Sequence, residues 1–291
     1  NGFQRTLDFQ PESAVPRQQP LINWGSKQMA VMPATTVESG QIGRAPSGGL
    51  MKMARSAGAL YLINIIGGAF AISIVPALLF GSDPAATAHN IQAHELLYRS
   101  GLAAHVVVTV TNIFLALIFY EIFKVVNRRL ALLDVFFILV ATAIEAAGLV
   151  NQFAPLALLG SGPYANALPA GQLQALAYLP SALASVDYNI HTVFFGFDIL
   201  LMAYLVLKSQ FIPRAIAVLL AIDGVAYLIY SFAAMLAPGF ASQLVPWIQL
   251  PALFGEGSLC LWLLVKGVNV ERWKAWASAA TRMRSTQMEA L

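Results

Sequence analysis

The chain has 291 residues, of which 58% are hydrophobic and only 11% are charged. Because roughly a quarter of the residues of a soluble domain are charged, this composition excludes an ordinary soluble domain and indicates an integral membrane protein. The net charge is +3, but the basic residues fall singly or in small groups between apolar runs. They therefore do not predict a nucleic-acid partner, which would need a basic face. A single cysteine, Cys260, excludes an internal disulfide framework and a thiolate metal cluster.

The N-terminal segment, residues 1–50, is rich in Pro, Ser, Gly, Gln and Thr and shows no apolar period. Such a segment cannot bury enough apolar surface to offset its ordering entropy, so it is predicted to be disordered. Met51 and Met53 stand beside basic residues just before the first apolar run, which makes Met51 a candidate start of translation. That run, 56–80, is too long for the apolar part of a cleaved signal peptide, although "AATA" at 85–88 loosely resembles a cleavage site. The run is therefore predicted to be a retained helix.

Six apolar segments each supply about 20 predominantly apolar residues, the length that a helix needs to cross a bilayer. Backbone groups in hydrocarbon must find their hydrogen bonds within the segment or in a closed barrel, and the composition here favours helices. The sequence thus predicts an all-α integral membrane protein with a six-helix transmembrane domain over residues 51–268. The predicted spans are 56–80, 101–125, 130–157, 189–207, 213–237 and 246–266.

Lys and Arg residues flank these spans on one side of the predicted membrane. They are Lys52, Arg55, Lys124, Arg128, Arg129, Lys208, Arg214, Lys266, Arg272, Lys274, Arg282 and Arg284. The opposite connections, 81–100, 158–188 and 238–245, contain only Arg99. By the positive-inside rule both termini are predicted to lie in the cytoplasm, with the chain a multi-pass protein of the inner or plasma membrane.

The connections and the tail have patterns of their own. Residues 83–100 predict a short interfacial helix, and residues 160–187 predict a loop with a helical turn. The tail, 269–291, places Trp273 and Trp276 among basic residues. This pattern suits an amphipathic helix on the anionic cytoplasmic leaflet, with a plain stop-transfer flank as the alternative.

Four stretches carry a resemblance to a known family: "AGALYLINIIGG", "LALIFYEIFKVVNRRLALL", "VFFGFDILLMAYLVLKSQFIPRAIAVLL" and "GEGSLCLWLLVKGV". They resemble the bacterial multi-pass membrane proteins of the family of unknown function DUF4386, over about residues 53–268. The Lys-Ser-x-x-Ile-Pro-Arg turn and the Gly-Glu…Leu-Trp-Leu-Leu-x-Lys-Gly ending occur in order and at suitable spacing. The resemblance implies a helical bacterial membrane protein and no known chemistry.

Several ionisable side chains fall inside the predicted spans. Counting about 1.5 Å per residue from the ends of each run places three acids near mid-membrane and three further groups in the outer half: Asp198, Asp223 and Glu256, then Glu145, His105 and His191. A charge at the bilayer centre costs between about 2.5 and more than 10 kcal/mol. No Lys or Arg lies within a run away from its cytoplasmic end, so the deep acids are expected to be protonated or to face water or a bound cation.

Two other acids, Glu121 and Asp134, are counted near the inner surface. They are expected to have a structural role, with their carboxylates reaching toward Lys124 and toward Arg128 or Arg129.

Two of the spans share a spacing. His105 precedes Asn112 by seven residues, and His191 precedes Asp198 by seven residues. Seven residues make about two helical turns, so both members of each pair lie on one helix face. Chance placement or an internal repeat explains the match, and transporters often have their sites at the interface of such repeats. The two halves of the repeat would be 101–157 and 187–237.

The leading functional hypothesis is that the protein binds or moves a small solute, ion or proton through an acidic cavity open to the outer side. The candidate binding residues are His105, Asn112, Glu145, His191, Asp198, Asp223 and Glu256. The bilayer is the other expected partner, and no cofactor or metal is assigned.

Two alternatives remain open. One is a membrane-embedded, metal-dependent hydrolase acting on lipid, in which His94, His105 and His191 approach Glu145 from the outer side. No His-Glu-x-x-His motif supports it. The other is a non-catalytic interaction or assembly protein, whose buried polar groups only join helices.

Overall fold

The computed structural model describes residues 47–81, 83–160 and 168–289, which fold almost entirely into helices with no strand among them. Most of the segment predicted to be disordered lies outside the described residues. The elements are α1 (Ser47–Gly68), a π-helix (Ala69–Ile74), α2 (Val75–Leu79), α3 (Pro84–Ala93), α4 (Glu95–Phe123), α5 (Arg128–Asn151), α6 (Ala154–Leu159), α7 (Ala170–Ser209), α8 (Arg214–Leu236), α9 (Pro238–Leu244), a 3₁₀ turn (Trp247–Gln249), α10 (Leu250–Val265) and α11 (Val270–Glu289).

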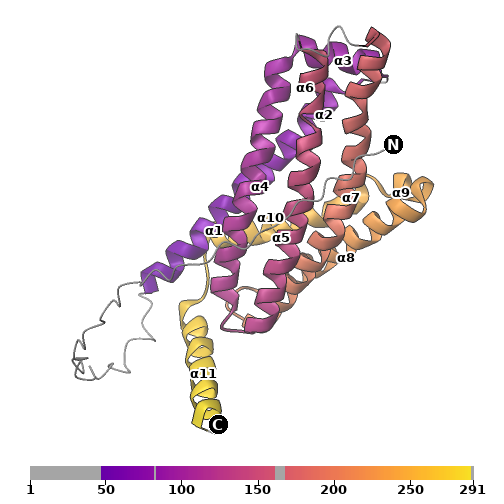
Figure 1. The fold of residues 1–291 in the computed structure, drawn as a ribbon. Helices are drawn as coiled ribbons and strands as arrows, with labels where there is room; N and C mark the ends of the chain where they lie inside the picture. Colours follow the sequence, from indigo (N-terminus) through magenta and orange to yellow (C-terminus); the bar gives the residue numbers. More distant parts are fainter. Residues whose placement is uncertain (1–46, 82, 161–167, 290–291) are drawn as a thin grey trace, which may run out of the picture. The chain divides into compact units, whose positions relative to one another are not determined.

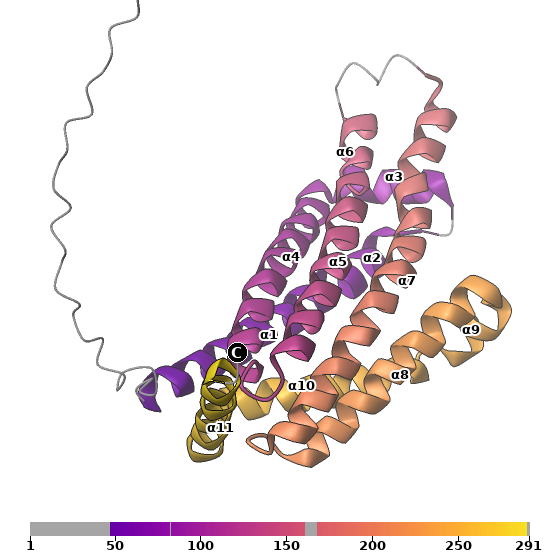
Figure 2. The same cartoon turned by 60° about the horizontal axis from the view of Figure 1, so that its bottom comes forward.

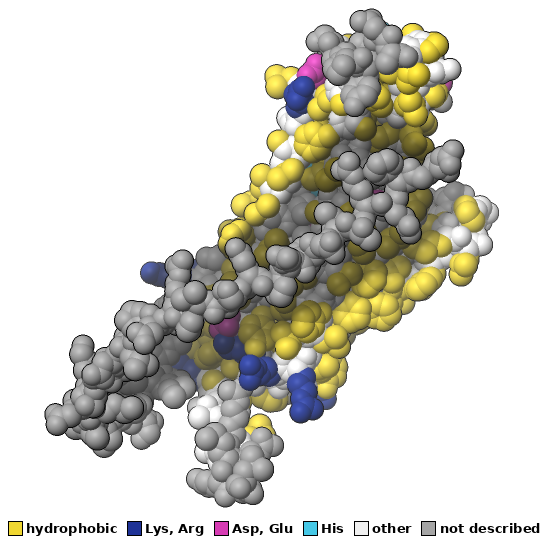
Figure 3. Space-filling model, in the orientation of Figure 1, with side chains coloured by type: hydrophobic (Ala, Val, Ile, Leu, Met, Phe, Trp, Pro, Cys, Tyr) yellow, Lys and Arg dark blue, Asp and Glu magenta, His cyan; other side chains and the backbone are white. Residues whose placement is uncertain are grey.

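The prediction of six membrane spans is confirmed. Six stretches of helix among the described residues are long and apolar enough to cross a bilayer, and they contain α1 with α2, α4, α5 with α6, α7, α8 and α10. Large apolar side chains such as Ile66, Leu117, Phe136 and Leu253 are exposed on these helices, and apolar atoms cover much of the visible surface of the bundle (Figure 3). Such a surface suits contact with lipid chains rather than with water.

The six spans form a closed ring. Each packs against the span before it and the span after it in the chain, and α10 returns to pack against α1 (Figure 1). Figure 2 shows the same order from a second direction. Glycines let two of these pairs approach closely: a Cβ on Gly58 would lie 2.6 Å from the backbone nitrogen of Leu264 in α10, and one on Gly224 would lie 2.9 Å from the carbonyl oxygen of Gly196 in α7. A closed ring leaves an interior that every span can line.

The two ends of the ring differ in charge. Lys124 and Lys208 lie at the ends of α4 and α7, and Arg128, Arg129 and Arg214 lie at the starts of α5 and α8. Dark blue side chains gather at the lower end in Figure 3. We call this the basic end and the other, which carries α3 and α6, the far end. The predicted cytoplasmic location of the basic end remains a prediction.

Two of the predicted connections contain helix, and one of them is more helical than expected. The segment predicted to be a loop between the third and fourth spans instead begins α7 at Ala170, so that this helix has 40 residues and contains Pro180. The predicted interfacial helix is α3, whose N-cap Asp83 accepts a hydrogen bond from the backbone N–H of Ala86. Both features lie at the far end.

The first span is not a regular α-helix. Residues 69–74 form a π-helix, in which the backbone N–H of Val75 donates to the carbonyl of Phe70, five residues earlier. Pro76 follows directly and has no backbone N–H to continue the α-helical ladder. Such π segments inside α-helices frequently occur at functional sites.

The tail is a helix, α11, tied to the basic end by its tryptophans. The indole N–H of Trp273 donates to the carbonyl of Ile122 in α4 at 2.9 Å, and that of Trp276 donates to the carbonyl of Ser209 in α7 at 3.0 Å. Both acceptors lie in the last turn of their helices, where carbonyls lack intrahelical partners. The two rings thus dock onto the bundle, and contact between the tail and a lipid leaflet remains a prediction.

Two apolar clusters bracket the middle of the bundle. The larger one, toward the basic end, includes Phe119, Phe123 and Phe211, and the rings of Phe123 and Phe211 stack with centroids 5.5 Å apart. The smaller one, toward the far end, includes Val75 and Leu102. Polar side chains of the spans gather between them.

Candidate functional site

A cavity of about 250 Å³ lies inside the ring, between the two apolar clusters. We call it the central cavity. Residues from all six spans line it, and its three acids come from three different helices: Glu145 from α5, Asp198 from α7 and Glu256 from α10. None of the described residues that line it is Lys or Arg. The cavity therefore collects three carboxyl groups, with no Lys or Arg among its described lining residues.

The structure brings together most of the predicted site residues. Asn112, Glu145, His191, Asp198 and Glu256 all line the central cavity. Counting along the spans placed Asp198 and Glu256 near mid-membrane and Glu145 and His191 in the outer half, and the ring closes these side chains around one space.

Two predicted site residues lie elsewhere. His105 lines a neighbouring cavity rather than the central one. Asp223 is 1% exposed, and a Cβ on Gly255 would lie 3.1 Å from its Oδ2, so it packs between α8 and α10. Since Asp223 is not among the lining residues, the prediction that it acts like Asp198 and Glu256 loses its geometric basis.

Glu256 is held by two tyrosines. The hydroxyl of Tyr61 in α1 donates to its Oε2 at 2.8 Å, and the hydroxyl of Tyr227 in α8 donates to its Oε1 at 2.8 Å. Each carboxylate oxygen can accept about two hydrogen bonds, so one acceptor position on each oxygen remains. The bonds fix the carboxylate at the cavity wall and join three helices.

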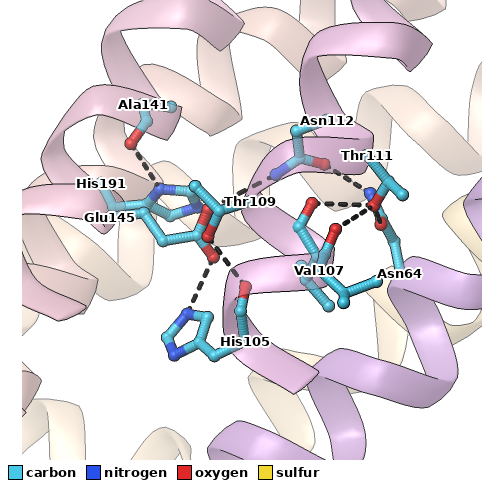
Figure 4. A network of polar contacts seen from close by, with 10 residues as sticks. Asn64, His105, Val107, Thr109, Thr111, Asn112, Ala141, Glu145 and His191 are labelled. Carbon is cyan, nitrogen blue, oxygen red and sulfur yellow. Dashed lines mark hydrogen bonds and ion pairs between the residues drawn. The ribbon is translucent and has the colours of Figure 1, made fainter. Parts of the chain in front are cut away.

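Glu145 is the centre of a second polar network (Figure 4). Its Oε1 lies 3.0 Å from Nε2 of His105, and its Oε2 accepts a hydrogen bond from the Asn112 amide at 3.4 Å. The Asn64 amide in turn donates to Oδ1 of Asn112 at 2.5 Å, and the hydroxyl of Thr111 donates to Oδ1 of Asn64. The network runs from α1 through α4 to α5.

The two pairs with equal spacing both face α5. His105 and Asn112 of α4 contact Glu145, as described above. On the other side of α5, Nδ1 of His191 lies 3.0 Å from the carbonyl oxygen of Ala141 (Figure 4), and Asp198 interacts with Asp134. The shared spacing thus corresponds to two helices that present their polar faces to the same neighbour.

The prediction for Asp134 is wrong. It was expected near the membrane surface, reaching toward arginine, but it is 2% exposed and its Oδ1 has no hydrogen-bond partner. Depth counting ignored the direction of the side chain, which points from α5 toward α7. The matching prediction for Glu121 is confirmed, because its Oε2 lies 2.5 Å from Nζ of Lys124.

A second cavity, of about 120 Å³, adjoins the first toward the far end, and we call it the far-end cavity. Its lining is mostly apolar, but it includes His105, Glu145, Asp187 and His191. Glu145 and His191 line both cavities, as do Ile72 and Tyr188. These shared residues mark the junction between an apolar space and an acidic one.

Comparison with family models gives one match, to the model described as Domain of unknown function (DUF4386), over residues 56–267. The chain belongs to the DUF4386 family. No curated protein and no solved structure matches it. The matched segment holds the whole lining of the central cavity and ends before α11, so the cavity is part of the DUF4386 domain.

The arrangement expected for a metal-dependent hydrolase, with His94, His105 and His191 around Glu145, is not found in this structure. His94 is exposed and bonds the Asn90 carbonyl, and it precedes His105 by eleven residues, about 16 Å along a helix. Within the described ranges, no group of three His, Cys, Asp or Glu side chains is arranged to hold a metal ion.

Sequence reasoning missed the aromatic lining of the DUF4386 cavity. Tyr61, Tyr188 and Phe195 line the central cavity, although each resembled an ordinary apolar or interfacial residue of a span. The one available signal was the hydroxyl of Tyr61, which falls inside the first predicted span, five residues from its start, and needs a hydrogen-bond partner there.

Proposed function

We propose that this protein binds a small cationic solute, an ion or a proton in the central cavity and carries it into or across the membrane. The observation that supports the proposal is the lining itself: three carboxyl groups from three helices, and no Lys or Arg among the described lining residues.

The electrostatic argument follows from the low dielectric of the surroundings. A carboxylate inside a membrane protein normally pairs with a cation, faces water or is neutralised by a proton. Glu256 and Asp198 have no basic partner in the cavity, so a positively charged ligand would supply the missing partner. The tyrosine hydroxyls on Glu256 hold its carboxylate in place and reduce the reorganisation that binding requires.

The position of the far-end cavity supports access from one end. The central cavity adjoins additional space toward the far end, whereas Phe119, Phe123 and Phe211 of the larger apolar cluster lie toward the basic end. The Glu145 and His191 side chains line both cavities and so lie at their junction. We therefore assign entry to the far end, which would be the outer side if the basic end is cytoplasmic.

The competing function is assembly, because the bonds from Tyr61 and Tyr227 to Glu256 also join helices. The two functions differ in their need for the carboxylate charge. If Glu256 only joins helices, an amide in its place still accepts hydrogen bonds and keeps that role. If Glu256 binds a cation, the amide removes the charge that binding requires.

The test compares Glu256→Gln and Asp198→Asn with Glu121→Gln, whose carboxylate is outside the cavity. Full-length protein in lipid nanodiscs would be titrated with sodium, potassium, calcium and choline salts between pH 5 and 9, with thermal stability as the readout. A ligand that binds only the folded state raises its stability with concentration. We expect such a rise for the unmodified protein and for Glu121→Gln, less at low pH because protons compete, and no rise for the two cavity variants. Cavity variants that fold and bind as the unmodified protein does would leave the acids with a structural role.

A further inference from the structure

The central cavity is aromatic as well as acidic. Five rings line it, from α1, α4, α7 and α8: Tyr61, Phe119, Tyr188, Phe195 and Tyr227. Two pairs meet edge to face, Tyr61 with Phe119 at 6.2 Å and 72°, and Phe195 with Tyr227 at 5.4 Å and 73°. The two rings of each pair therefore stand at steep angles to each other, and all five rings contribute to the wall of the cavity.

Aromatic faces attract organic cations. A cation within about 6 Å of a ring centroid interacts with the ring's negative face, and cages of such rings recognise quaternary ammonium groups. Two of the rings here, Tyr61 and Tyr227, hydrogen-bond the Glu256 carboxylate. The same side chains thus supply π-faces and fix the countercharge.

The oxygen ligands suit a bare metal ion less well. Calcium takes six to eight oxygen ligands, and magnesium requires near-octahedral geometry. The acids of the central cavity stand on separate helices, and the part of the chain that the structure describes holds no cluster of three donors placed for a metal. An ammonium group needs only a countercharge and apolar or aromatic contact.

The far-end cavity adds an apolar compartment. Beyond the shared residues Ile72 and Tyr188, its lining includes Val75, Leu102 and Ala184. A ligand with its charged group among the rings would extend an apolar substituent into this space. The residues that line both cavities include polar Glu145 and His191 as well as apolar Ile72, so the junction offers contacts to both parts of such a ligand.

We propose that the ligand is an organic ammonium ion with a short apolar substituent. Its charged head occupies the central cavity, between the aromatic rings, Asp198 and Glu256, and its substituent occupies the far-end cavity. This inference rests on the proposed function and names the class of cation that the cavity takes.

The experiment measures binding of four probes to the full chain in nanodiscs by calorimetry: tetramethylammonium, butyltrimethylammonium, sodium and uncharged 3,3-dimethylbutanol. Butyltrimethylammonium is expected to bind on the order of 50-fold more tightly than tetramethylammonium, because three further methylenes are buried. The uncharged alcohol is expected not to bind. Phe195→Leu is expected to weaken butyltrimethylammonium binding on the order of 10-fold, while the matched control Phe197→Leu, whose ring is on the outer surface of α7, leaves it unchanged.

The outcomes separate the two proposals. Sodium or proton binding that depends on Glu256, without binding of either ammonium compound, would overturn the ligand class and leave the proposed function standing. Absence of binding by every cation tested would overturn both. Equal effects of Phe195→Leu and Phe197→Leu would overturn recognition by the rings. If Phe195→Leu does not fold, the unmodified protein still provides a test. Its affinity for butyltrimethylammonium is then compared with its affinity for the uncharged alcohol, and equal affinities would overturn the inference.

Discussion

The closure of the ring between α1 and α10 predicts that Gly58→Ala destabilises the protein. Gly58 follows Ala54 and Ala57, which are both fully buried, on the face of α1 toward α10. An added Cβ would lie 2.6 Å from the backbone nitrogen of Leu264 and 3.1 Å from the carbonyl oxygen of Cys260. These are backbone atoms, so no side-chain rotation can relieve the contact.

The size of the effect follows from the distance. Ordinary contact begins at 3.4 Å, so the helices would have to separate by about 0.8 Å at this point. A gap of 0.5–1 Å loses about a quarter to a half of the dispersion attraction of the atoms involved, and overpacking typically costs about 1–3 kcal/mol. Alanine returns up to about 1 kcal/mol through its higher helix propensity. A net loss of about 1–2 kcal/mol in the free energy of unfolding is expected.

The assay is reversible unfolding in mixed micelles with increasing denaturing detergent, followed by tryptophan fluorescence. Gly257→Ala serves as the control, because this glycine is also in a helix but an added Cβ there meets nothing within 4 Å. We expect Gly257→Ala to be neutral or slightly stabilising. If Gly58→Ala is equally benign, α1 and α10 do not meet as described, and the ring that encloses the cavity is not closed.

Three further predictions concern the basic end and the topology. Gly267→Ala should lower stability by about 1–2 kcal/mol, because this residue has φ +67°, which L side chains rarely adopt, and an added Cβ would also meet Sδ of Met51; an unchanged unfolding midpoint would contradict this. Trp273→Phe removes the donor to a carbonyl of α4 and should cost about 0.5–1.5 kcal/mol in the same assay, whereas no loss would indicate that the tail is not docked. Single cysteines at Ser242 and Ser285, in a cysteine-free background, should react with an impermeant thiol reagent from opposite sides of the membrane; labelling from one side would refute the predicted topology.

The sequence predicted the spans well, because each is a predominantly apolar run long enough to cross a bilayer. It failed for the first half of α7, where Pro180 and the polar residues around it resemble a loop. A proline is tolerated there because neighbouring helices and local adjustments can satisfy the freed backbone groups, and such tertiary context cannot be read from one segment.

For the candidate site, the sequence predicted how deep each residue lies in the membrane but not the direction in which its side chain points. Counting residues placed Asp198 and Glu256 near mid-membrane and Glu145 in the outer half, and the structure has all three carboxyl groups in the lining of one cavity. The same counting could not separate Asp223, which turns into the contact between α8 and α10, or recognise that Asp134 turns inward. Which face of a helix meets its neighbours depends on the packing of the whole ring.

The π-helix in the first span has a consequence for comparing members of the family. A π turn holds one residue more than an α turn in the same rise, so it is equivalent to an insertion within the helix. Ile72 in this segment lines both cavities, and Ala69 and Ser73 line the central one. A homologue with one residue fewer between positions 69 and 74 would regain a continuous α-helix and rotate its following turn by about 100°. Length variation at this point is therefore expected to mark homologues whose cavities accept ligands of different size.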